Sequence, residues 1–383
     1  MTSLLLFMVG DGRRRGYREM LEAFWDSAEL AGVLMPSETP VSAAAFCQAR
    51  HKLSPGFFRT LLRAADAKFD ECFPDEGRWR GRRLLAVDGS HITLQRSPAL
   101  FRAFGSASDA YNPQARVSTL INVSSLVPVD VAVDRYQASE RHLLTEGHLR
   151  YVRGGDIVLL DRGYPGYREF RSLMNRGADF VARVSLEGTF KAIMEFAAGS
   201  KAEAIIRLTS EDGSPPLEVR IIRSPRDNAE PVIFVTTLRA GDGYSRADID
   251  ELYHLRWEAE EHYKAVKSEY MAQGQLHSKS PNGVRQEVFA ITLFHALSRL
   301  ALAHAAEQES VPFAELSTKA ACLGASEFLL RLIFGGHRSP EDWGRKLAAR
   351  LARSRVPPRP GRSFPRRSFK PRPRWGPRGR LRA

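Results

Sequence analysis

The sequence is poor in cysteine, and it contains none of the short motifs that mark several common enzyme classes. Its three cysteines, Cys47, Cys72 and Cys322, lie far apart and form no C-x-x-C pair. This spacing argues against a disulfide framework and against a zinc site. There is also no H-E-x-x-H, no Walker loop and no serine nucleophile elbow. We therefore expect a protein of a reducing, intracellular setting without zinc-protease, P-loop or serine-hydrolase chemistry.

No signal for secretion or membrane insertion is expected at the N-terminus. The apolar run from Leu4 to Val9 is too short to span a bilayer, and its arginine cluster at 13–15 follows the run, whereas a signal peptide has its basic residues first. The hydrophobic content of 43% is ordinary for a globular protein, and 383 residues can form one large core or two to three modules.

Acidic residues are absent from the last stretch of the chain. Residues 353–383 hold 12 Lys or Arg and no Asp or Glu, so the other 352 residues carry 45 basic against 44 acidic side chains and are close to neutral. The stretch is rich in Pro and Arg without an apolar period, which predicts disorder. It could bind phosphates nonspecifically, or it could be a run-on translation of a GC-rich gene. The net charge of +13 therefore does not decide the function.

The first 75 residues have a helical pattern. We expect helices over 14–31 and 42–53, and a third that begins at Ser54-Pro55 and reaches about Phe73. Two helices joined by a tight turn are compatible with a helix-turn-helix DNA reader. The polar side chains available to it would be Gln48, Arg50, His51, Lys52 and Arg59. A helical bundle that packs on the next domain fits the same pattern.

Two apolar strands in the middle of the chain each end in an aspartate. The runs 83–87 and 156–160 predict buried strands that stop at Asp88 and Asp161, with further strands over 116–124 and 127–136 and a helix over 140–152 between them. Carboxylates at strand ends lie at the rim of a helix-covered sheet, so these two can share a metal ion if their strands are neighbours. A single aspartate at such a position more commonly forms a turn or caps a helix. Two such aspartates, together with the Glu260 helix of the C-terminal half, favour the metal site.

One helix in the C-terminal half gathers charged side chains into a stripe. At about 100° per residue, Tyr253, Arg256, Glu260 and Lys267 fall on one narrow face, whereas Glu258 projects elsewhere. A glutamate that holds a metal ion beside cations that hold phosphates would have this arrangement. A surface helix with Arg–Glu salt bridges would have it too.

The segment that precedes this helix has a different pattern. Residues 186–245 have β character with turn signals at 211–216 and 225–228, which predicts a small β insertion. Ser245 and Asp248 then predict a capping box at the start of the Glu260 helix. Farther on, the apolar run 288–305 predicts a helix packed under the sheet.

Together, these motifs resemble the DDE transposases of bacterial insertion sequences, with the insertion-sequence-four family as the closest branch. The resemblance spans about 43–300 and is carried by Asp88-Gly-Ser, Asp161-Arg-Gly-Tyr and the pattern Y-x-x-R-x-x-x-E-x-x-x-x-x-x-K. It implies an α/β fold: an RNase H-like catalytic core with a β-strand insertion, here behind an N-terminal helical domain. The expected domains are 1–75 (helical, with possible DNA binding), 76–185 and 246–335 (the two parts of the core), 186–245 (the insertion) and 336–383 (a C-terminal segment with the disordered basic tail).

The resemblance also implies the chemistry. Asp88, Asp161 and Glu260 would be catalytic and would jointly bind two Mg²⁺ or Mn²⁺ ions, because three carboxylates gathered without cations would repel one another. The ions would serve an in-line phosphodiester displacement, first by water and later by a DNA 3′-hydroxyl, without a covalent protein–DNA intermediate.

The neighbouring side chains would bind DNA. By resemblance, Tyr253, Arg256 and Lys267 would hold phosphates near the scissile bond. Arg162 would contact phosphate or form a structural salt bridge, and Trp257 would stack on an extruded base or lie in the core.

The expected function is therefore cut-and-paste DNA transposition in the bacterial cytoplasm, at the nucleoid. The partners would be terminal inverted repeats and target DNA, with a homodimer pairing the two ends. Two alternatives stay open: a transposase-derived DNA-binding protein without catalysis, and another RNase H-like nuclease that acts on RNA or recombination intermediates.

Overall fold

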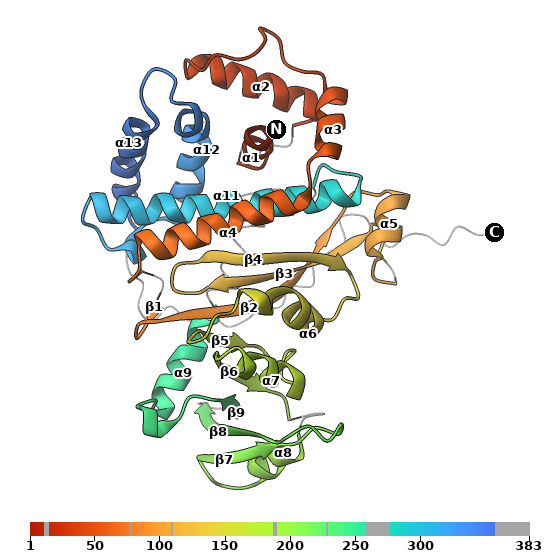
Figure 1. Ribbon diagram of the computed structural model, residues 1–383, viewed down its shortest axis with the longest axis vertical. Helices are drawn as coiled ribbons and strands as arrows, with labels where there is room; N and C mark the ends of the chain where they lie inside the picture. The colour runs from red at the N-terminus through yellow and green to blue at the C-terminus, as the bar shows by residue number, and fades with distance from the viewer. Residues whose placement is uncertain are drawn as a thin grey trace, which may run out of the picture.

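A computed structural model describes residues 1–10, 15–76, 78–108, 110–186, 190–226, 229–257, 260 and 276–356. The molecule is elongated, with most of its helices at one end, the central strands in the middle and the insertion at the other end (Figure 1). Of the basic stretch 353–383 that the sequence predicts to be disordered, residues 353–356 are described, and Arg355 forms an antiparallel bridge with Leu316; the rest lies outside the described residues.

The N-terminal segment is helical, as predicted. Its helices are α1 (Thr2–Gly10), α2 (Tyr17–Leu30), α3 (Ala43–Lys52) and α4 (Pro55–Cys72). Ser42 and Ser54 cap α3 and α4 by accepting hydrogen bonds from backbone N–H groups of the first turn. The apolar run Leu4–Val9 lies in α1 and is buried, so it forms part of the protein core.

Two of the five side chains proposed for DNA reading by the N-terminal helices are engaged inside the protein. Arg50 is buried and donates to Glu287 at 2.9 Å. Arg59 forms two hydrogen bonds with the buried carboxylate of Asp130. The prediction that these two arginines face a partner is therefore wrong, because each satisfies a carboxylate that folding buries.

One sheet runs through the rest of the molecule. Its nine strands follow the order β4-β3-β2-β5-β6-β9-β8-β7, with β1 paired to β2. Their bounds are β1 (Arg78–Trp79), β2 (Arg82–Thr93), β3 (Gln114–Asn122), β4 (Val127–Arg135), β5 (Ile157–Leu160), β6 (Asp179–Val184), β7 (Glu203–Leu208), β8 (Leu217–Arg226) and β9 (Ala229–Thr236). β2, β3 and β4 are antiparallel neighbours, and β5 and β6 run parallel to β2. This is the RNase H-like arrangement, which confirms the predicted fold class.

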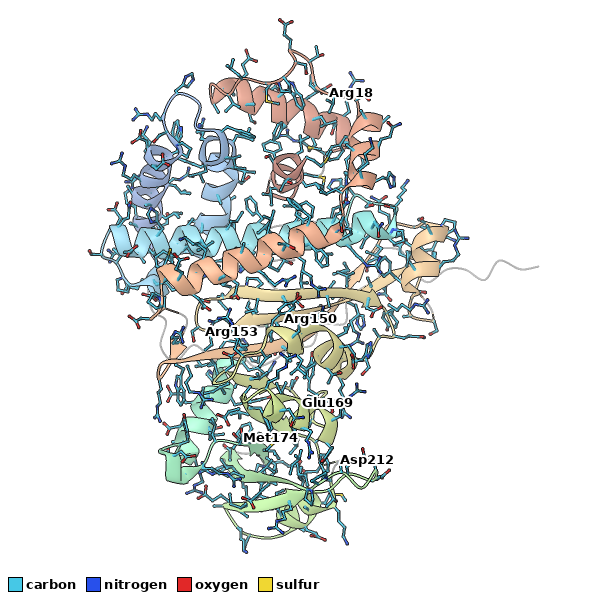
Figure 2. All side chains as sticks on the ribbon, in the orientation of Figure 1. Arg18, Arg150, Arg153, Glu169, Met174 and Asp212 are labelled. Carbon is cyan, nitrogen blue, oxygen red and sulfur yellow. The ribbon has the colours of Figure 1, made fainter. Side chains whose placement is uncertain are left out.

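The insertion continues the same sheet, because β9 pairs antiparallel with β6. It also contains a helix, α8 (Lys191–Ala198), where the sequence pattern indicated β structure alone. Ile193 and Phe196 are its buried residues, and their spacing of three is a helical period that the surrounding β pattern obscured. Asp212 marks the β7–β8 turn at the far end of the insertion (Figure 2).

The segment after β4 is not the single α-helix predicted for 140–152. It consists of α6 (Glu140–His142), a π-helical turn (Leu143–Gly147) and a 3₁₀ turn (His148–Tyr151). The change of winding accompanies the complete burial of His148, whose ring contacts Asp130 at 2.8 Å and Ser118 at 3.0 Å.

The two faces of the sheet pack against different helices. One face buries Leu85 and Val87 with α7 (Tyr167–Asn175) and α8. The opposite face buries Leu84 and Ala86 with α9 (Arg246–Leu255). Successive residues of a strand point to opposite faces, so this packing fixes the side to which each later residue of β2 and β5 points.

The C-terminal helices complete the helical end. They are α11 (Pro281–Gln308), α12 (Thr318–Phe334) and α13 (Pro340–Ala352), and α5 (Pro98–Phe104) lies beside the sheet. α11 crosses over β4 together with α4 (Figure 1), which confirms the apolar helix predicted under the sheet. By length and composition α11 could cross a membrane, but 78% of its apolar stretch is buried inside the protein, as in a core helix.

Candidate active site

Asp88, Asp161 and Arg183 form one row across three neighbouring parallel strands. β2 pairs with β5 as far as Ala86 and Leu159, and two residues further along these strands come Asp88 and Asp161. β5 pairs with β6 at Leu159 and Val181, so two residues further along β6 Arg183 lies beside Asp161. The register of the sheet therefore brings the two predicted aspartates to the same level and adds a cation that the sequence analysis did not select.

The sequence predicted that the strand carrying Asp88 stops at this residue, but in the structure the strand continues past it. β2 continues to Thr93 because its antiparallel pairing with β3 extends to Gln114. The parallel neighbour β5 does stop at Leu160, so the sheet opens beyond it on that side of β2. Asp88 thus lies at the rim of the parallel part of the sheet and not at the end of its own strand.

Helix α9 brings the remaining side chains to the rim. Its N-terminus has the predicted capping box between Ser245 and Asp248, and Ile249 and Leu252 bury it against the face to which Ala86 and Leu159 also contribute. This is the face to which Asp88 and Asp161 point by strand alternation.

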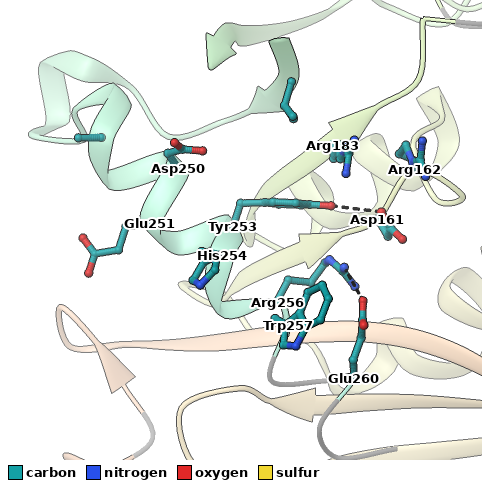
Figure 3. Close-up of a pocket in the computed structure, with 12 residues that line it drawn as sticks. Asp161, Arg162, Arg183, Asp250, Glu251, Tyr253, His254, Arg256, Trp257 and Glu260 are labelled. Carbon is teal, nitrogen blue, oxygen red and sulfur yellow. Dashed lines mark hydrogen bonds and ion pairs between the residues drawn. The ribbon is translucent and has the colours of Figure 1, made fainter. Parts of the chain in front are cut away.

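Two contacts join α9 and the residues after it to the candidate site. The hydroxyl of Tyr253 donates to Asp161 Oδ1 at 3.2 Å, and Arg256 Nη2 donates to Glu260 Oε1 at 3.0 Å (Figure 3). The helix is less regular than predicted, because α9 ends at Leu255 with Arg256 as its C-cap. Three of the four residues of the predicted stripe therefore lie at one place, and the fourth, Lys267, lies outside the described residues, as does Glu258.

The electrostatics link the three carboxylates. The pKa of Asp88 is raised to about 6: burial is the largest cause, the Gly89 N–H and Arg256 act in the opposite direction, and the charges of Glu260 and Asp161 add to the rise. Burial likewise raises the pKa of Tyr253, with Asp161 adding to the effect, so its phenol stays protonated and can donate. The side chains of Asp88, Asp161 and Glu260 are thus close enough for their charges to interact.

Arg256 is incompletely satisfied. Its side chain is buried, and its Nε has no hydrogen-bond partner within the described part of the chain. A buried guanidinium N–H without an acceptor is costly, and a phosphate oxygen is an acceptor that it would bind well.

The donor set suits a hard divalent cation, because it consists of carboxylate oxygens at one rim. Across the described residues, however, no three His, Cys, Asp or Glu side chains are already arranged to hold a metal ion. The ion pair with Arg256 engages one oxygen of Glu260, Oε1. The residue types at this rim therefore fit a divalent metal.

A cavity of about 690 Å³ opens beside these groups. Arg162, Arg183 and Trp257 line it together with Asp161 and Glu260 (Figure 3). Trp257 is 39% exposed, so it is not the core residue considered as one alternative. Arg162 is exposed, and within the described residues it forms no ion pair, which argues against the structural salt bridge.

Glu140 is a site neighbour that the sequence analysis missed. A Cβ added to Gly89 would lie 2.6 Å from Glu140 Oε1, and one added to Gly163 would lie 2.9 Å from Oε2. Arg116 holds the same carboxylate at 2.6 Å. Glu140 therefore packs between the segments that carry Asp88 and Asp161. The sequence indicates this contact only through the glycines close behind the aspartates, Gly89 and Gly163.

The sequence itself matches a family model. Residues 79–297, more than half of the chain, match the model described as a transposase DDE domain. This chain belongs to that family. The match covers the strands and helices that carry Asp88, Asp161 and Glu260, and it includes the insertion.

Solved structures show a fold similar to that of this DDE-domain protein, whereas curated sequences do not match it. No curated protein sequence matches the chain. Among solved structures, the fold is similar to that of the piggyBac transposase in a synaptic complex with hairpin DNA, determined by cryo-EM, with a TM-score of 0.44 and 10% sequence identity. The similarity covers 73% of this chain and 59% of the piggyBac chain.

Proposed function

We propose that this DDE-domain protein is a DNA transposase of the insertion-sequence-four type, which cuts DNA at the ends of its element and joins them to target DNA. The observation that carries the proposal is the row formed by Asp88 and Asp161, to which the residues after α9 add Glu260. Membership of the transposase DDE family supports the substrate class.

Asp88, Asp161 and Glu260 are the proposed catalytic residues. Together they would hold two Mg²⁺ or Mn²⁺ ions, which would supply activation of a water or DNA 3′-hydroxyl and stabilisation of the leaving oxygen. Tyr253 orients Asp161 through its hydrogen bond, and Arg183 and Arg162 attract the phosphates of the DNA toward the cavity.

Arg256 couples DNA binding to the readiness of the site. In the protein alone it neutralises Glu260. A DNA phosphate would compete for the same guanidinium, whose Nε has no acceptor among the described residues, and would thereby release Glu260 to act as a metal ligand. Lys267 remains a proposed phosphate contact on the basis of the motif alone.

The remaining parts of the proposal concern assembly. The N-terminal helices, 1–75, would contact the terminal inverted repeats through exposed residues such as His51 and Lys52, and two copies would pair the two element ends. The protein would act at the bacterial nucleoid. The mass of the complex with the flanking DNA ends, measured by light scattering, would test this pairing. A complex in which a single copy of the protein holds both ends would refute it.

Cleavage of the DNA that flanks this gene tests the central proposal. Wild type with Mg²⁺ or Mn²⁺ should cut at the element ends, and Glu260→Gln should bind the same DNA without cutting it. Glu251→Gln is the control, because Glu251 is an exposed glutamate of α9 whose side chain points away from Asp161 and Glu260 (Figure 3). It should cut like wild type.

The same assay separates the alternatives. A wild type that binds these ends but never cuts them with either metal would indicate a DNA-binding protein without catalysis. Metal-dependent cutting of RNA or branched DNA without preference for the ends would indicate another RNase H-like nuclease.

A further inference from the structure

A second cavity, of about 770 Å³, adjoins the candidate active site and lies outside the carboxylate cluster. It lies between the start of α7, the start of α8 and the end of β7, and Arg162 lines both cavities. We call this cavity the insertion groove.

The insertion groove is strongly basic. Arg141, Arg162, Lys191 and Arg207 line it, against one acidic residue, Glu211. All four cations are exposed. Such a surplus of cations in one concave surface attracts a polyanion.

The contacts that these four cations make within the described residues do not neutralise their charges. Arg141 donates to a backbone carbonyl, that of Gly163. Lys191 has one loose contact with Glu195, at 3.7 Å, between side chains that are 86% and 65% exposed. Arg162 and Arg207 form no ion pair within the described residues. An exposed pair of this kind contributes little, so the groove keeps its positive charge.

Two aromatic rings line the same groove. Phe190 is half-buried and packs near Phe170 with 6.5 Å between ring centroids, and Tyr167 is fixed by its hydroxyl, which donates to the Pro215 carbonyl at 2.6 Å. Aromatic rings beside cations are the features with which proteins bind single strands, because each base of a single strand presents a face for stacking. In a duplex the base faces are already stacked on one another and only the edges and backbone can be contacted.

We propose that the insertion groove binds a single strand of DNA that leads away from the candidate active site. Arg162 lines both cavities and can contact the strand between them, with Arg207 and Lys191 holding phosphates and Phe190 and Tyr167 contacting bases. The occupant rests on the proposed transposase function, which supplies a DNA strand at the carboxylates.

Fluorescence anisotropy with the full chain tests the groove without any cleavage. The probes are a duplex with a single-stranded tail of about ten thymidines and the same duplex without a tail. The variant is Lys191→Ala/Arg207→Ala. The matched control, Lys201→Ala/Arg176→Ala, removes the same charges from exposed positions at the far ends of β7 and α7.

Wild type should prefer the tailed probe. The groove variant should bind it about tenfold more weakly, with a salt dependence reduced by about 1.4 in log–log slope, since two phosphate contacts are lost. The blunt probe and the control variant should show no comparable change. Equal binding of the tailed probe by wild type and groove variant, or equal weakening in the control, would overturn the proposal.

Photocrosslinking provides a second readout that does not depend on the variants. A tail with 5-iodouracil should crosslink to Tyr167 or Phe190, and crosslinks confined to other segments would overturn the proposal. A protein that binds the tail here but never cuts DNA would refute the proposed catalysis and leave the groove standing. Cutting without tail binding would refute the groove alone.

Discussion

Two clusters in this protein use the same residue types, arginine and carboxylate, and differ in how completely their members are paired. In the first, Asp130 is fully buried, accepts two hydrogen bonds from Arg59 and contacts His148, which in turn contacts Ser118. Burial alone would raise the pKa of Asp130, but His148 and Arg59 outweigh it and hold the pKa low. This Ser–His–Asp chain has no exposed nucleophile, so it is structural.

The second cluster lies at the rim of the sheet, and its arginine is incompletely satisfied. One of its aspartates, Asp88, has a pKa raised to about 6, and the Nε of Arg256 lacks an acceptor in the described structure. Comparison of the two clusters separates a structural role from a ligand-binding role. In the first cluster the complete pairing stabilises the fold, whereas in the second the Nε of Arg256, which has no acceptor in the described structure, can donate to an outside ligand.

The same substitution placed in each cluster should have opposite consequences. Asp130→Asn removes the countercharge of Arg59 and should lower the free energy of unfolding by about 3 to 5 kcal/mol. Asp161→Asn removes one of several repelling carboxylates, so it should change stability by less than about 1 kcal/mol while cleavage falls at least about a thousandfold.

Urea denaturation and end-cleavage rates of both variants test this contrast. Unfolding is compared at one pH without added metal, because a bound metal would itself stabilise the wild type. If Asp161→Asn lost as much stability as Asp130→Asn, the rim cluster would be structural and the distinction would fail.

Asp66 sharpens the comparison, because it is buried but poorly paired. Its nearest cation, Arg83, lies 3.5 Å away and is engaged by Asp156. Burial raises the pKa of Asp66 to about 6. Since the folded pKa lies above the unfolded value of about 4, this group stabilises the fold fully below about pH 4, and the contribution is lost as the pH rises through about 6.

Asp66→Asn should remove this pH dependence. Relative to the variant, the wild type should lose up to about 3 kcal/mol between about pH 4 and pH 7, as judged by denaturant unfolding at several pH values. The difference between the two proteins isolates Asp66 from all other groups. A difference that stays constant with pH would contradict the assignment.

The smallest expected effect concerns the packing between the two aspartate segments. Gly89→Ala places a Cβ against the Glu140 carboxylate, which Arg116 holds in place. We expect a loss of about 1 to 2 kcal/mol in thermal or urea unfolding, because the glutamate must shift.

The matched control is Gly147→Ala, since an added Cβ there meets no atom within 4 Å. Glu140→Asp has a shorter side chain and should partly rescue Gly89→Ala. No rescue, or an equal loss in the control, would show that the Glu140 contact does not require a glycine.

The sequence predicted most of the fold, because its local signals were strong. Alternating or continuous apolar runs with turn residues located the strands, and Ser245 with Asp248 located the start of α9. The β2–β5 pairing could not be read from the sequence, since register depends on contacts between segments more than 70 residues apart. Only the structure places Asp88 level with Asp161.

The missed features share one physical cause: they depend on tertiary contacts. Arg183 looks like any polar residue of a strand until the sheet places it beside Asp161. Glu140 has no motif of its own and is identified by the space it takes beside Gly89. Arg50 looked available for DNA because nothing near it in sequence announces Glu287.

Anomalous diffraction from crystals soaked in Mn²⁺ tests the central claim most directly. We expect an anomalous peak bound by Asp88 and Asp161, with Glu260 released from Arg256 to join them when a DNA end is present. No peak at saturating Mn²⁺, or a peak elsewhere with the Arg256–Glu260 pair intact, would contradict it.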